Sequence, residues 1–258
     1  MTSVQWTASD ALAMTRRNLL RYVRIPNLLV FSTVQPVMFV LLFNYVFGGA
    51  VSAGLPPGVK YIDFLMPGIF VQTVVFGSTN TGVGLADDLS RGMIDRFRSL
   101  PMARSAVLAG RTLSDLVRNV FVVLLMTFVG VIIGFRIHTG LIPALAALGL
   151  VVLFGFSFSW ISATIGLSVG EVESAQTAGF VWIFPLTFAS SVFVPIRGMP
   201  GWLQAFAKAN PVSNTANALR ALTLGGPTTR PLFYSVAWLV GILLVFVPLA
   251  TRRYRRIT

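Results

Sequence analysis

The segment DDLSRGMIDRFRSLPMARSAVLAGR, residues Asp87–Arg111, is the longest charged, helix-compatible stretch in a chain that is otherwise mostly apolar. In a helix, four apolar side chains share one side at the spacing i, i+1, i+4 and i+7, namely Met93, Ile94, Phe97 and Leu100. Arg91 and Asp95 are spaced for an i,i+4 ion pair away from that side, where Arg98 also lies. Pro101 then ends the helix or starts a new one.

This charged segment has two interpretations, and its residues alone leave both open. It is an ordinary connecting loop whose charges keep it in water, which is the commoner case in membrane proteins. Alternatively it is a docking helix, with a small apolar ridge and a basic rim held outside the membrane for another protein to bind. The sequence on either side decides between them.

The composition indicates an integral membrane protein. The 258 residues are 55% hydrophobic and only 11% charged, with a mean hydropathy of +0.79, whereas soluble domains carry about 25% charged residues. The net charge of +12 could indicate nucleic acid, but the arginines flank apolar segments and so are expected to face anionic lipid. The chain has no cysteine, which excludes disulfides and thiolate metal sites, and no cleavable signal is visible.

Six segments are long enough to cross a bilayer core of about 30 Å, which requires roughly 20 apolar residues. The predicted fold is therefore an all-α, single transmembrane domain over 1–258. The fifth segment is the weakest, because Thr177, Gly179 and Pro185 interrupt its apolar run. The six predicted spans are Leu28–Phe47, Tyr61–Leu85, Leu113–Phe135, Leu141–Ser168, Ala175–Val194 and Leu232–Thr251.

The distribution of positive residues predicts that both termini are cytoplasmic. With the N-terminus inside, thirteen Lys and Arg residues fall on the cytoplasmic side: Arg16, Arg17, Arg21, Arg24, Arg91, Arg96, Arg98, Arg104, Arg111, Arg252, Arg253, Arg255 and Arg256. Six fall outside: Lys60, Arg136, Arg197, Lys208, Arg220 and Arg230. Arg118 lies within the third span near its inner end, where its side chain can snorkel.

The N-terminal segment Val4–Arg24 is predicted to be a basic amphipathic helix ahead of the first span. Its apolar face contains Leu12, Leu19 and Val23, although Arg16 intrudes on that face. Such a helix lies at the membrane interface, where each basic residue near anionic lipid adds about 1 kcal/mol. A plain positive-inside anchor remains the alternative.

The outer segment Pro195–Pro231 is predicted to contain two short helices, too short to span and too apolar for a free loop. The first places Trp202 and Phe206 on one apolar face, and Asn210-Pro211 then breaks the chain. Ser213 can cap the second helix, which ends at Gly225-Gly226. Both helices, including Pro211 and Arg220, are expected to be re-entrant or interfacial and to fold onto the outer mouth of the bundle.

Proline and glycine predict local packing. Pro36 and Pro185 lie inside spans, and the usual explanation is a packing kink whose freed carbonyls find partners in neighbouring helices or a wet cavity. Gly130-x-x-x-Gly134 and Gly166-x-x-x-Gly170 permit close helix approach, which we expect to serve packing within the bundle rather than dimerisation.

Catalytic chemistry is missing from the sequence. No P-loop motif occurs, so the chain is not expected to bind ATP through such a motif, and the single histidine, His138, lies in a short outer loop. The acids Asp63, Asp115, Glu171 and Glu173 are all predicted at helix ends, where they would not serve an ion-coupled carrier. No serine is arranged with a His or Asp as nucleophilic catalysis requires. We therefore expect neither an enzyme nor a metal or cofactor site.

The sequence resembles the membrane subunits of type-2 ABC exporters, specifically permeases of the daunorubicin-resistance type. The matching stretches are QPVMFVLLFNYVFGGA (Gln35–Ala50), YIDFLMPGIF (Tyr61–Phe70), the Asp88–Arg111 loop with its core GMIDRFRSLPMARSAVLAGR, and FVPIRGMPGWLQAFAKANPVSNTANALRALTLGG (Phe193–Gly226). The loop is the most specific piece, because it keeps the family's order and spacing at Gly92, Asp95, Arg96, Pro101 and Arg104.

The resemblance implies a six-helix subunit with an N-terminal interfacial helix, a cytoplasmic coupling helix and outer re-entrant helices. Two permeases, identical or paralogous, pair in the cell membrane with two ATP-binding subunits, which bind the ATP and Mg. Closure of the ATP-binding subunits pushes on the coupling helix and alternates access to a cavity. The docking interpretation of the loop is then favoured over the linker interpretation. The residues expected to couple to the ATP-binding subunit are Arg91, Gly92, Met93, Ile94, Asp95, Arg96, Phe97, Arg98, Leu100, Pro101, Arg104, Glu171 and Glu173.

The cargo expected from the resemblance is a hydrophobic or amphipathic, drug-like compound moved outward. Its pathway would involve aromatic residues of the second and fifth spans, for which the candidates are Phe70, Phe76, Phe184 and Phe188. The alternatives are an exporter of lipids or glycan carriers, and a non-transporting assembly or immunity factor with the same fold. No nucleic-acid partner is expected.

Overall fold

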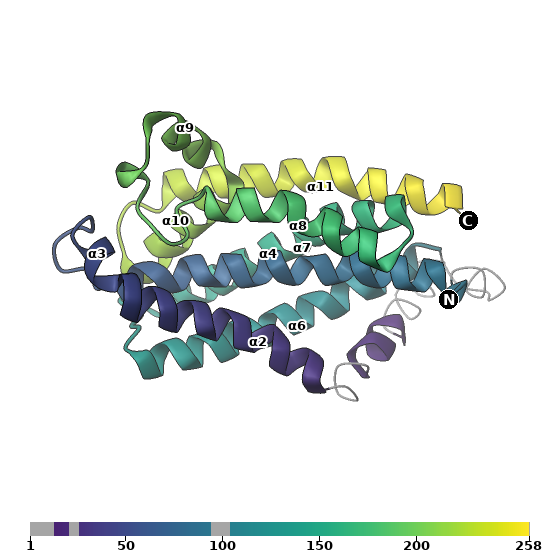
Figure 1. The fold of residues 1–258 in the computed structure, drawn as a ribbon, viewed down its shortest axis with the longest axis horizontal. Helices are drawn as coiled ribbons and strands as arrows, with labels where there is room; N and C mark the ends of the chain where they lie inside the picture. The colour runs from purple at the N-terminus through teal and green to yellow at the C-terminus, as the bar shows by residue number, and fades with distance from the viewer. Residues whose placement is uncertain (1–12, 21–25, 94–103, 258) are drawn as a thin grey trace.

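The computed structural model describes residues 13–20, 26–93 and 104–257, and every regular element in these ranges is helical (Figure 1). Residues 13–20 form a short helix ahead of the bundle. The remaining elements are α2 (Pro26–Leu41), η1 (Leu42–Phe47), α3 (Gly48–Ser52), α4 (Tyr61–Ser90), α6 (Arg104–Ile133), α7 (Leu141–Val169), α8 (Val172–Phe188), η2 (Ile196–Gly198), α9 (Gly201–Ala209), α10 (Pro211–Leu224) and α11 (Thr229–Ile257).

The first predicted span is one continuous helical segment with a change of winding. α2 continues past Pro36, so this proline does not end the helix. η1 is a π-helical turn that joins α2 to α3 without a break. π-turns are rare and often mark functional segments.

α4 forms the centre of the bundle and packs against α2, α6, α7, α8 and α10. Small residues allow this close packing. A Cβ atom on Gly82 would overlap the carbonyl oxygen of Ser162, and one on Gly166 would overlap the carbonyl oxygen of Gly82. Gly130 likewise faces the side chain of Met66. The first glycine of each GxxxG pair therefore serves packing within the bundle, as predicted.

Within the described residues, five helices are long and apolar enough to cross a membrane: Thr33–Ser52, Tyr61–Ser90, Leu108–Ile133, Leu141–Val169 and Thr229–Arg256. The predicted fifth span, 175–194, differs. α8 has 17 residues and ends at Phe188, which gives a length of about 26 Å at 1.5 Å per residue. Residues 189–194 form turns rather than the last turns of this helix.

The two ends of the bundle carry different elements. The helix at 13–20, the last turn of α4, the first turn of α8 and the last turn of α11 lie at one end, which we call the termini end (Figure 1). The opposite end, which we call the far end, carries α3, α9 and α10.

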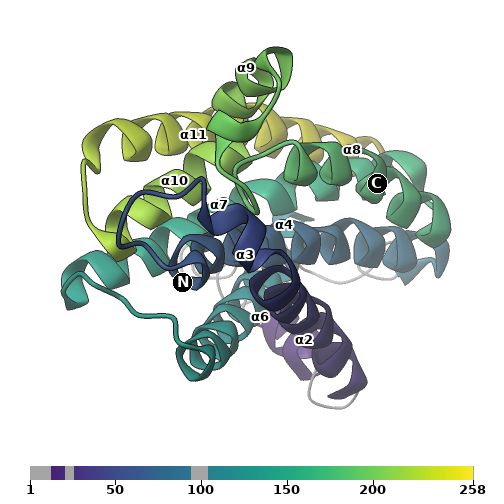
Figure 2. The same cartoon turned by 60° about the vertical axis from the view of Figure 1, so that its left-hand side comes forward.

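The two outer helices pack differently from the prediction. α9 extends away from the bundle (Figure 2), and its Trp202 and Phe206 are 75% and 44% exposed. The expectation that these two side chains fold onto the mouth of the bundle is wrong within this chain, because α9 packs mainly against η2 and α10. α10 is instead buried against α4, α7 and α11.

Side-chain capping sets the limits of α10. The side-chain oxygen of Asn210 accepts a hydrogen bond from the backbone N–H of Val212, and Pro211 occupies the first turn. Asn210, not Ser213, is therefore the N-cap. The helix ends at Gly225, which has a φ of +92° that favours glycine, as the sequence predicted.

Candidate substrate pathway and coupling surface

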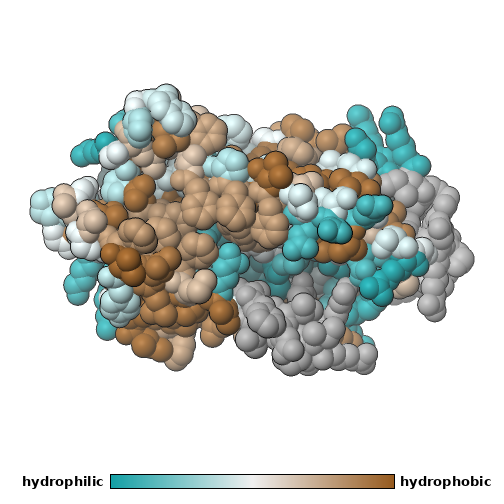
Figure 3. Space-filling view, viewed as in Figure 1, coloured by the Kyte–Doolittle hydropathy of each residue, from teal (hydrophilic) through white to brown (hydrophobic). Residues whose placement is uncertain are grey.

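A polar cavity of about 410 Å³ lies among α2, α4, α6 and α8. This volume lies in the range of pockets that hold small molecules. The exposed side chains of Gln35, Asn80 and Gln176 edge the cavity, and Figure 3 shows hydrophilic atoms in a hollow between the hydrophobic surfaces of α2 and α8. The lining residues are Gln35, Pro36, Gln72, Thr73, Phe76, Gly77, Thr79, Asn80, Val83, Arg118, Asn119, Val122, Gln176 and Phe180.

Polar side chains in the cavity wall retain unused hydrogen-bonding capacity. Gln72 is only 2% exposed, and its Oε1 has no hydrogen-bond partner among the described residues. The hydroxyl of Thr73 and the amide nitrogen of Asn119 are likewise buried without a partner. Burying an unsatisfied polar group costs about 1–3 kcal/mol. Such groups are therefore expected to bind water or a ligand.

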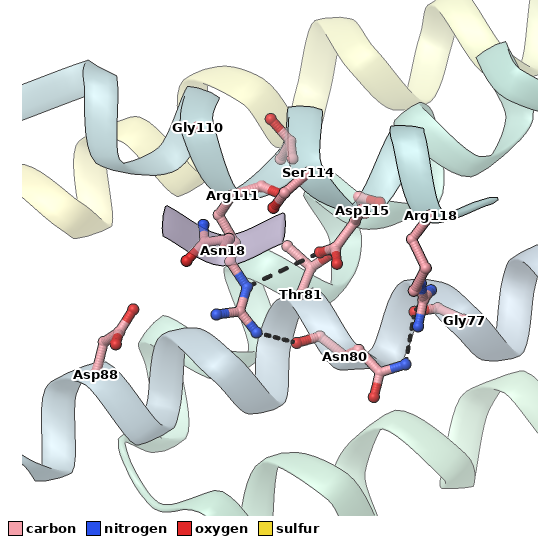
Figure 4. A network of polar contacts seen from close by, with 12 residues as sticks. Asn18, Gly77, Asn80, Thr81, Asp88, Gly110, Arg111, Ser114, Asp115 and Arg118 are labelled. Atoms are coloured by element: carbon pink, nitrogen blue, oxygen red, sulfur yellow. Dashed lines mark hydrogen bonds and ion pairs between the residues drawn. The ribbon is translucent and has the colours of Figure 1, made fainter. Parts of the chain in front are cut away.

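Two arginines of α6 lie over two glycines of α4, and Figure 4 shows one of these pairs, Arg118 beside Gly77. Arg118 donates to the carbonyl oxygen of Gly77 at 2.7 Å and to Oδ1 of Asn119 at 2.9 Å. The side chain of Arg111 occupies the space that a Cβ on Gly84 would need. The two glycines are seven residues apart on α4, and the two arginines are seven residues apart on α6. The spacing of the glycines therefore matches that of the arginines.

Arg118 and Asp115 lie deeper than the sequence indicated. Arg118 is 5% exposed and borders the cavity, so the predicted snorkelling to the membrane surface is wrong. Asp115 is fully buried, not at a helix end, because α6 begins nine residues before the predicted span. Its carboxylate accepts a 2.5 Å hydrogen bond from the Thr81 hydroxyl and lies 3.9 Å from Nε of Arg111.

A row of phenylalanines leads from the cavity towards the far end. Phe76 and Phe180 line the cavity, and the Phe76 ring lies 5.3 Å from that of Phe184. Phe184 contacts Phe188 at 5.4 Å, and Phe188 contacts Phe193 at 5.4 Å. Rings of the first span complete the row, which we call the phenylalanine row: Phe39, Phe43, Phe47, Phe76, Phe180, Phe184, Phe188 and Phe193.

The candidate pathway residues are thus only partly brought together. Phe76, Phe184 and Phe188 belong to the phenylalanine row, and the last two are exposed. Phe70 is buried elsewhere in the core, where its ring meets that of Phe135 edge-on at 6.1 Å. No sequence pattern indicates Phe39, Phe43 and Phe193, because their alignment depends on contacts between helices.

The candidate coupling residues that the structure describes lie at the termini end. Arg91 is exposed, and its Nε lies 2.7 Å from the Asp87 carboxylate. Gly92 has a φ of +63° and its N–H donates to the carbonyl of Leu89, which ends α4. Met93 follows directly. The remaining loop candidates lie outside the described residues: Ile94, Asp95, Arg96, Phe97, Arg98, Leu100 and Pro101.

The other coupling candidates extend this surface. Glu171 caps α8 and accepts a hydrogen bond from the Ser174 hydroxyl at 3.2 Å, and Glu173 lies in the first turn; both are exposed. Arg104 opens α6, and its side chain lies outside the described part of the chain. The termini end therefore presents exposed groups of both charges.

The helix at 13–20 packs on the termini end by a face that the hydropathy pattern did not indicate. Met14 and Asn18 are buried, and Met14 belongs to a core cluster with Leu85, Leu108, Trp160, Leu167, Ala250 and Tyr254. Thr15 donates to the carbonyl of Gly110, and Arg17 lies 3.6 Å from Asp88. Leu19 is only half-buried. This helix therefore contacts α4 just before the candidate coupling loop and α6 just after it.

At the far end, Arg220 of α10 ties the irregular segment 189–194 to α4. Arg220 is 8% exposed, and burial lowers its pKa to about 9. It donates to the carbonyl oxygens of Phe64 (2.8 Å), Ser191 (2.7 Å) and Val192 (3.0 Å), and its guanidinium lies 3.6 Å from the Phe64 ring centre. Asn210 adds a bond to the carbonyl of Leu186 at 2.7 Å. These bonds replace the missing helical ones.

Comparisons with known proteins agree on the family. The sequence pattern of the family described as "ABC-2 type transporter" matches residues 10–224. The daunorubicin resistance ABC transporter permease protein DrrB1 of Streptomyces coeruleorubidus is 36% identical over 239 residues, which cover 93% of this chain and 83% of that protein. The probable doxorubicin resistance ABC transporter permease protein DrrC of Mycobacterium tuberculosis is 30% identical over 249 residues, with 96% and 89% covered. The putative transport permease ycf38 of Cyanophora paradoxa is 27% identical over 216 residues, with 83% and 73% covered.

Proposed function

The chain belongs to the ABC-2 type transporter family, and we propose that it is the permease subunit of an ATP-driven exporter of hydrophobic or amphipathic, drug-like compounds. The observation that carries this proposal is the polar cavity continued by the phenylalanine row. A compound with a polar group and an aromatic body finds both surfaces side by side. The names of two relatives, which refer to daunorubicin and doxorubicin resistance, support the same class of cargo.

The arrangement of the two surfaces supports an outward direction of transport. α8 runs from the termini end towards the far end, so Phe180, Phe184 and Phe188 extend over about 12 Å in that direction. With both termini cytoplasmic, as the positive residues favour, cargo enters the cavity from the inner side and leaves along the rings. Aromatic rings bind flat apolar molecules without selecting one structure strongly, which suits a drug exporter.

A second permease subunit is proposed to cover the face that carries the cavity. Gln35, Asn80 and Gln176 are exposed on this face, and polar side chains are unfavourable against lipid. Phe184 and Phe188 are exposed beside them. Pairing two permeases, identical or paralogous, would shield both sets of residues and join two cavities into one alternating-access pathway.

The energy is proposed to come from two ATP-binding subunits, which bind the ATP and Mg and dock on the termini end. The exposed Arg91, Glu171 and Glu173 offer charges of both signs for that contact, and the loop candidates around Phe97 would supply its apolar ridge. Arg111 and Asp115 connect the base of this loop to Asn80 and Thr81 near the cavity. A push on the loop would thereby reach the cavity wall.

The export proposal is tested in inside-out vesicles that contain the permease and its ATP-binding subunit. We expect ATP-dependent uptake of daunorubicin, measured by its fluorescence. Phe184→Leu should lower uptake several-fold, because loss of an aromatic contact costs about 0.5–1.5 kcal/mol. Phe128→Leu, at an exposed position on α6 away from the row, is the matched control. Equal uptake with ATP and with a non-hydrolysable analogue would contradict the proposal.

The docking proposal is tested by Phe97→Ala. A buried aromatic anchor commonly costs about 2 kcal/mol or more when truncated at an interface, so the ATP-binding subunit should co-purify less and lose its cargo-stimulated ATP hydrolysis. The level of permease in the membrane should not change. Unchanged co-purification and hydrolysis would show that the loop is a linker.

The sidedness of the loop is tested by thiol labelling, because the chain has no cysteine of its own. Of the two variants Ser90→Cys and Ser52→Cys, only the latter should react with an impermeant thiol reagent in cells.

A further inference from the structure

The sign of the charge in the cavity wall distinguishes classes of cargo. Within the described part of the chain, fourteen residues line the cavity; Arg118 is the only charged one of these, and none of them is acidic. Asp115, one turn away on α6, is bound to Thr81 and lies against Arg111. Two arginines and one carboxylate give this part of the α4–α6 contact a net positive charge, and Arg118 is the member of this group that lines the cavity.

We propose that this cavity selects the anionic or oxygen-rich end of an amphipathic aromatic compound and disfavours a cationic amine there. Daunorubicin carries an amine as well as oxygen-rich rings, and in this cavity its rings, not its amine, would face Arg118. The inference deepens the proposed export function and rests on the cavity assigned there. Arg118 would donate to a carboxylate or carbonyl oxygen of the cargo, and charge-assisted bonds of this kind are the stronger ones. Oε1 of Gln72, which is buried and has no hydrogen-bond partner in the described part of the chain, would accept from a neighbouring hydroxyl of the cargo.

The hydrogen bonds inside the wall fix the orientation of these groups. Arg118 donates to Oδ1 of Asn119 and to the carbonyl of Gly77, so its guanidinium is held in place on the wall before cargo arrives. A preorganised cation in a low-dielectric site discriminates between charges more strongly than one in water. Phe76 and Phe180, which line the same cavity, would hold the aromatic body next to the charged end.

The test uses three probes with one aromatic body: 1-pyrenebutyric acid, 1-pyrenebutanol and 1-pyrenebutylamine. Binding to the purified permease in zwitterionic lipid nanodiscs is followed by pyrene fluorescence at pH 7, with empty nanodiscs as the partition control. We expect the acid to bind about tenfold more tightly than the alcohol, which corresponds to one charge-assisted hydrogen bond, and the amine to bind more weakly than the alcohol.

Two variants test whether the preference for the acid depends on the residues of the cavity wall. Arg118→Gln should bring the affinity for the acid to within about threefold of that for the alcohol, whereas Arg197→Gln, at an exposed position of η2, should change nothing. Gln72→Glu keeps Arg118 in place but adds a carboxylate that offsets its charge, so it should abolish the preference for the acid over the amine. This second variant keeps the test decisive if Arg118→Gln does not fold.

The inference is overturned if the parent binds the amine as tightly as the acid, if it does not bind the acid, or if Gln72→Glu prefers the acid as strongly as the parent does. These outcomes are separable from failure of the proposed function, because binding needs neither ATP nor the ATP-binding subunit. Probes that bind in the expected order but are never exported would refute export alone. Export that ignores the charge of the probe would refute this inference alone.

Discussion

Two buried arginines, Arg220 at the far end and Arg118 in the cavity wall, show how similar groups take different roles. The guanidinium of Arg220 donates hydrogen bonds to backbone carbonyls of α4 and of segment 189–194, and it lies against the Phe64 ring. Arg118 also bonds to a carbonyl and an amide but borders a cavity among side chains with unused polar atoms. The first region is closed by its own hydrogen bonds, whereas the second leaves capacity for a ligand.

Removing Arg220 is expected to have the largest effect. Arg220→Leu leaves the carbonyl oxygens of Phe64, Ser191 and Val192 without these bonds, which costs on the order of 3–5 kcal/mol in stability. Because a protein's total stability is about 5–15 kcal/mol, little folded permease should remain after detergent extraction, as measured by size-exclusion chromatography. Arg220→Lys should fare little better, since an ammonium cannot reproduce the planar fork.

The control for Arg220 is Arg197→Leu, which lies at an exposed position in the same outer segment. Its yield should match that of the parent. If Arg220→Leu extracts and melts like the parent, the hydrogen-bonded region is not what holds segment 189–194 in place, and the comparison fails.

A pair of glycine substitutions separates the two regions at an intermediate level. A Cβ on Gly68 would overlap the backbone of Val192, whereas one on Gly77 would lie 2.5 Å from a terminal nitrogen of Arg118. Backbone cannot move aside cheaply, but the end of a side chain can. Gly68→Ala should therefore destabilise the permease by about 1–3 kcal/mol, and Gly77→Ala should leave its melting temperature nearly unchanged.

Gly77→Ala should instead weaken binding of 1-pyrenebutyric acid, because it displaces the guanidinium of Arg118. Both variants are compared by thermal melting and by probe affinity on the same preparations. An equal loss of stability in both, or unchanged affinity in Gly77→Ala, would show that the two regions do not differ in this respect.

The smallest change in stability is expected from Gln72→Leu, and its sign is the informative part. This substitution removes a buried oxygen that has no partner among the residues the structure describes, so the melting temperature should stay the same or rise by about 2–4 °C per kcal/mol gained. Export should fall. A clear drop in melting temperature would mean that Gln72 supports the fold, as Arg220 does.

The sequence predicted most of the fold because length and hydropathy are sufficient to locate membrane-spanning helices. Five of the six expected spans correspond to helices that are long and apolar enough to cross a membrane. The end of the fifth was misplaced because segment 189–194 is apolar enough to continue a helix, yet Arg220 and Asn210 offer its carbonyls bonds from side chains. Such competition between distant groups leaves no local pattern.

The candidate site was predictable only in part, for a related reason. Hydropathy placed the start of the third span at Leu113, so Asp115 appeared to lie at a helix end, whereas the helix begins at Arg104. The cavity draws residues from four helices, and no single periodicity indicates which polar side chains meet there. The exposure of Trp202 on α9 was missed because an amphipathic pattern identifies an apolar face but not what covers it.

The π-turn η1 has a consequence for the alignment of the rings. Phe39, Phe43 and Phe47 are four residues apart, and in an α-helix each such step overshoots a full turn by about 40°, so a stack of rings would wind steadily around the helix. The wider winding of Leu42–Phe47 rotates the chain less per residue and offsets that drift. The Phe39–Phe43 and Phe43–Phe47 rings consequently stay 6.0 and 5.2 Å apart. The extra residue of the wide turn thus corrects the direction in which the next ring points. A one-residue deletion there would rotate the ring of Phe47 out of line with that of Phe39 while leaving the hydropathy of the span nearly unchanged.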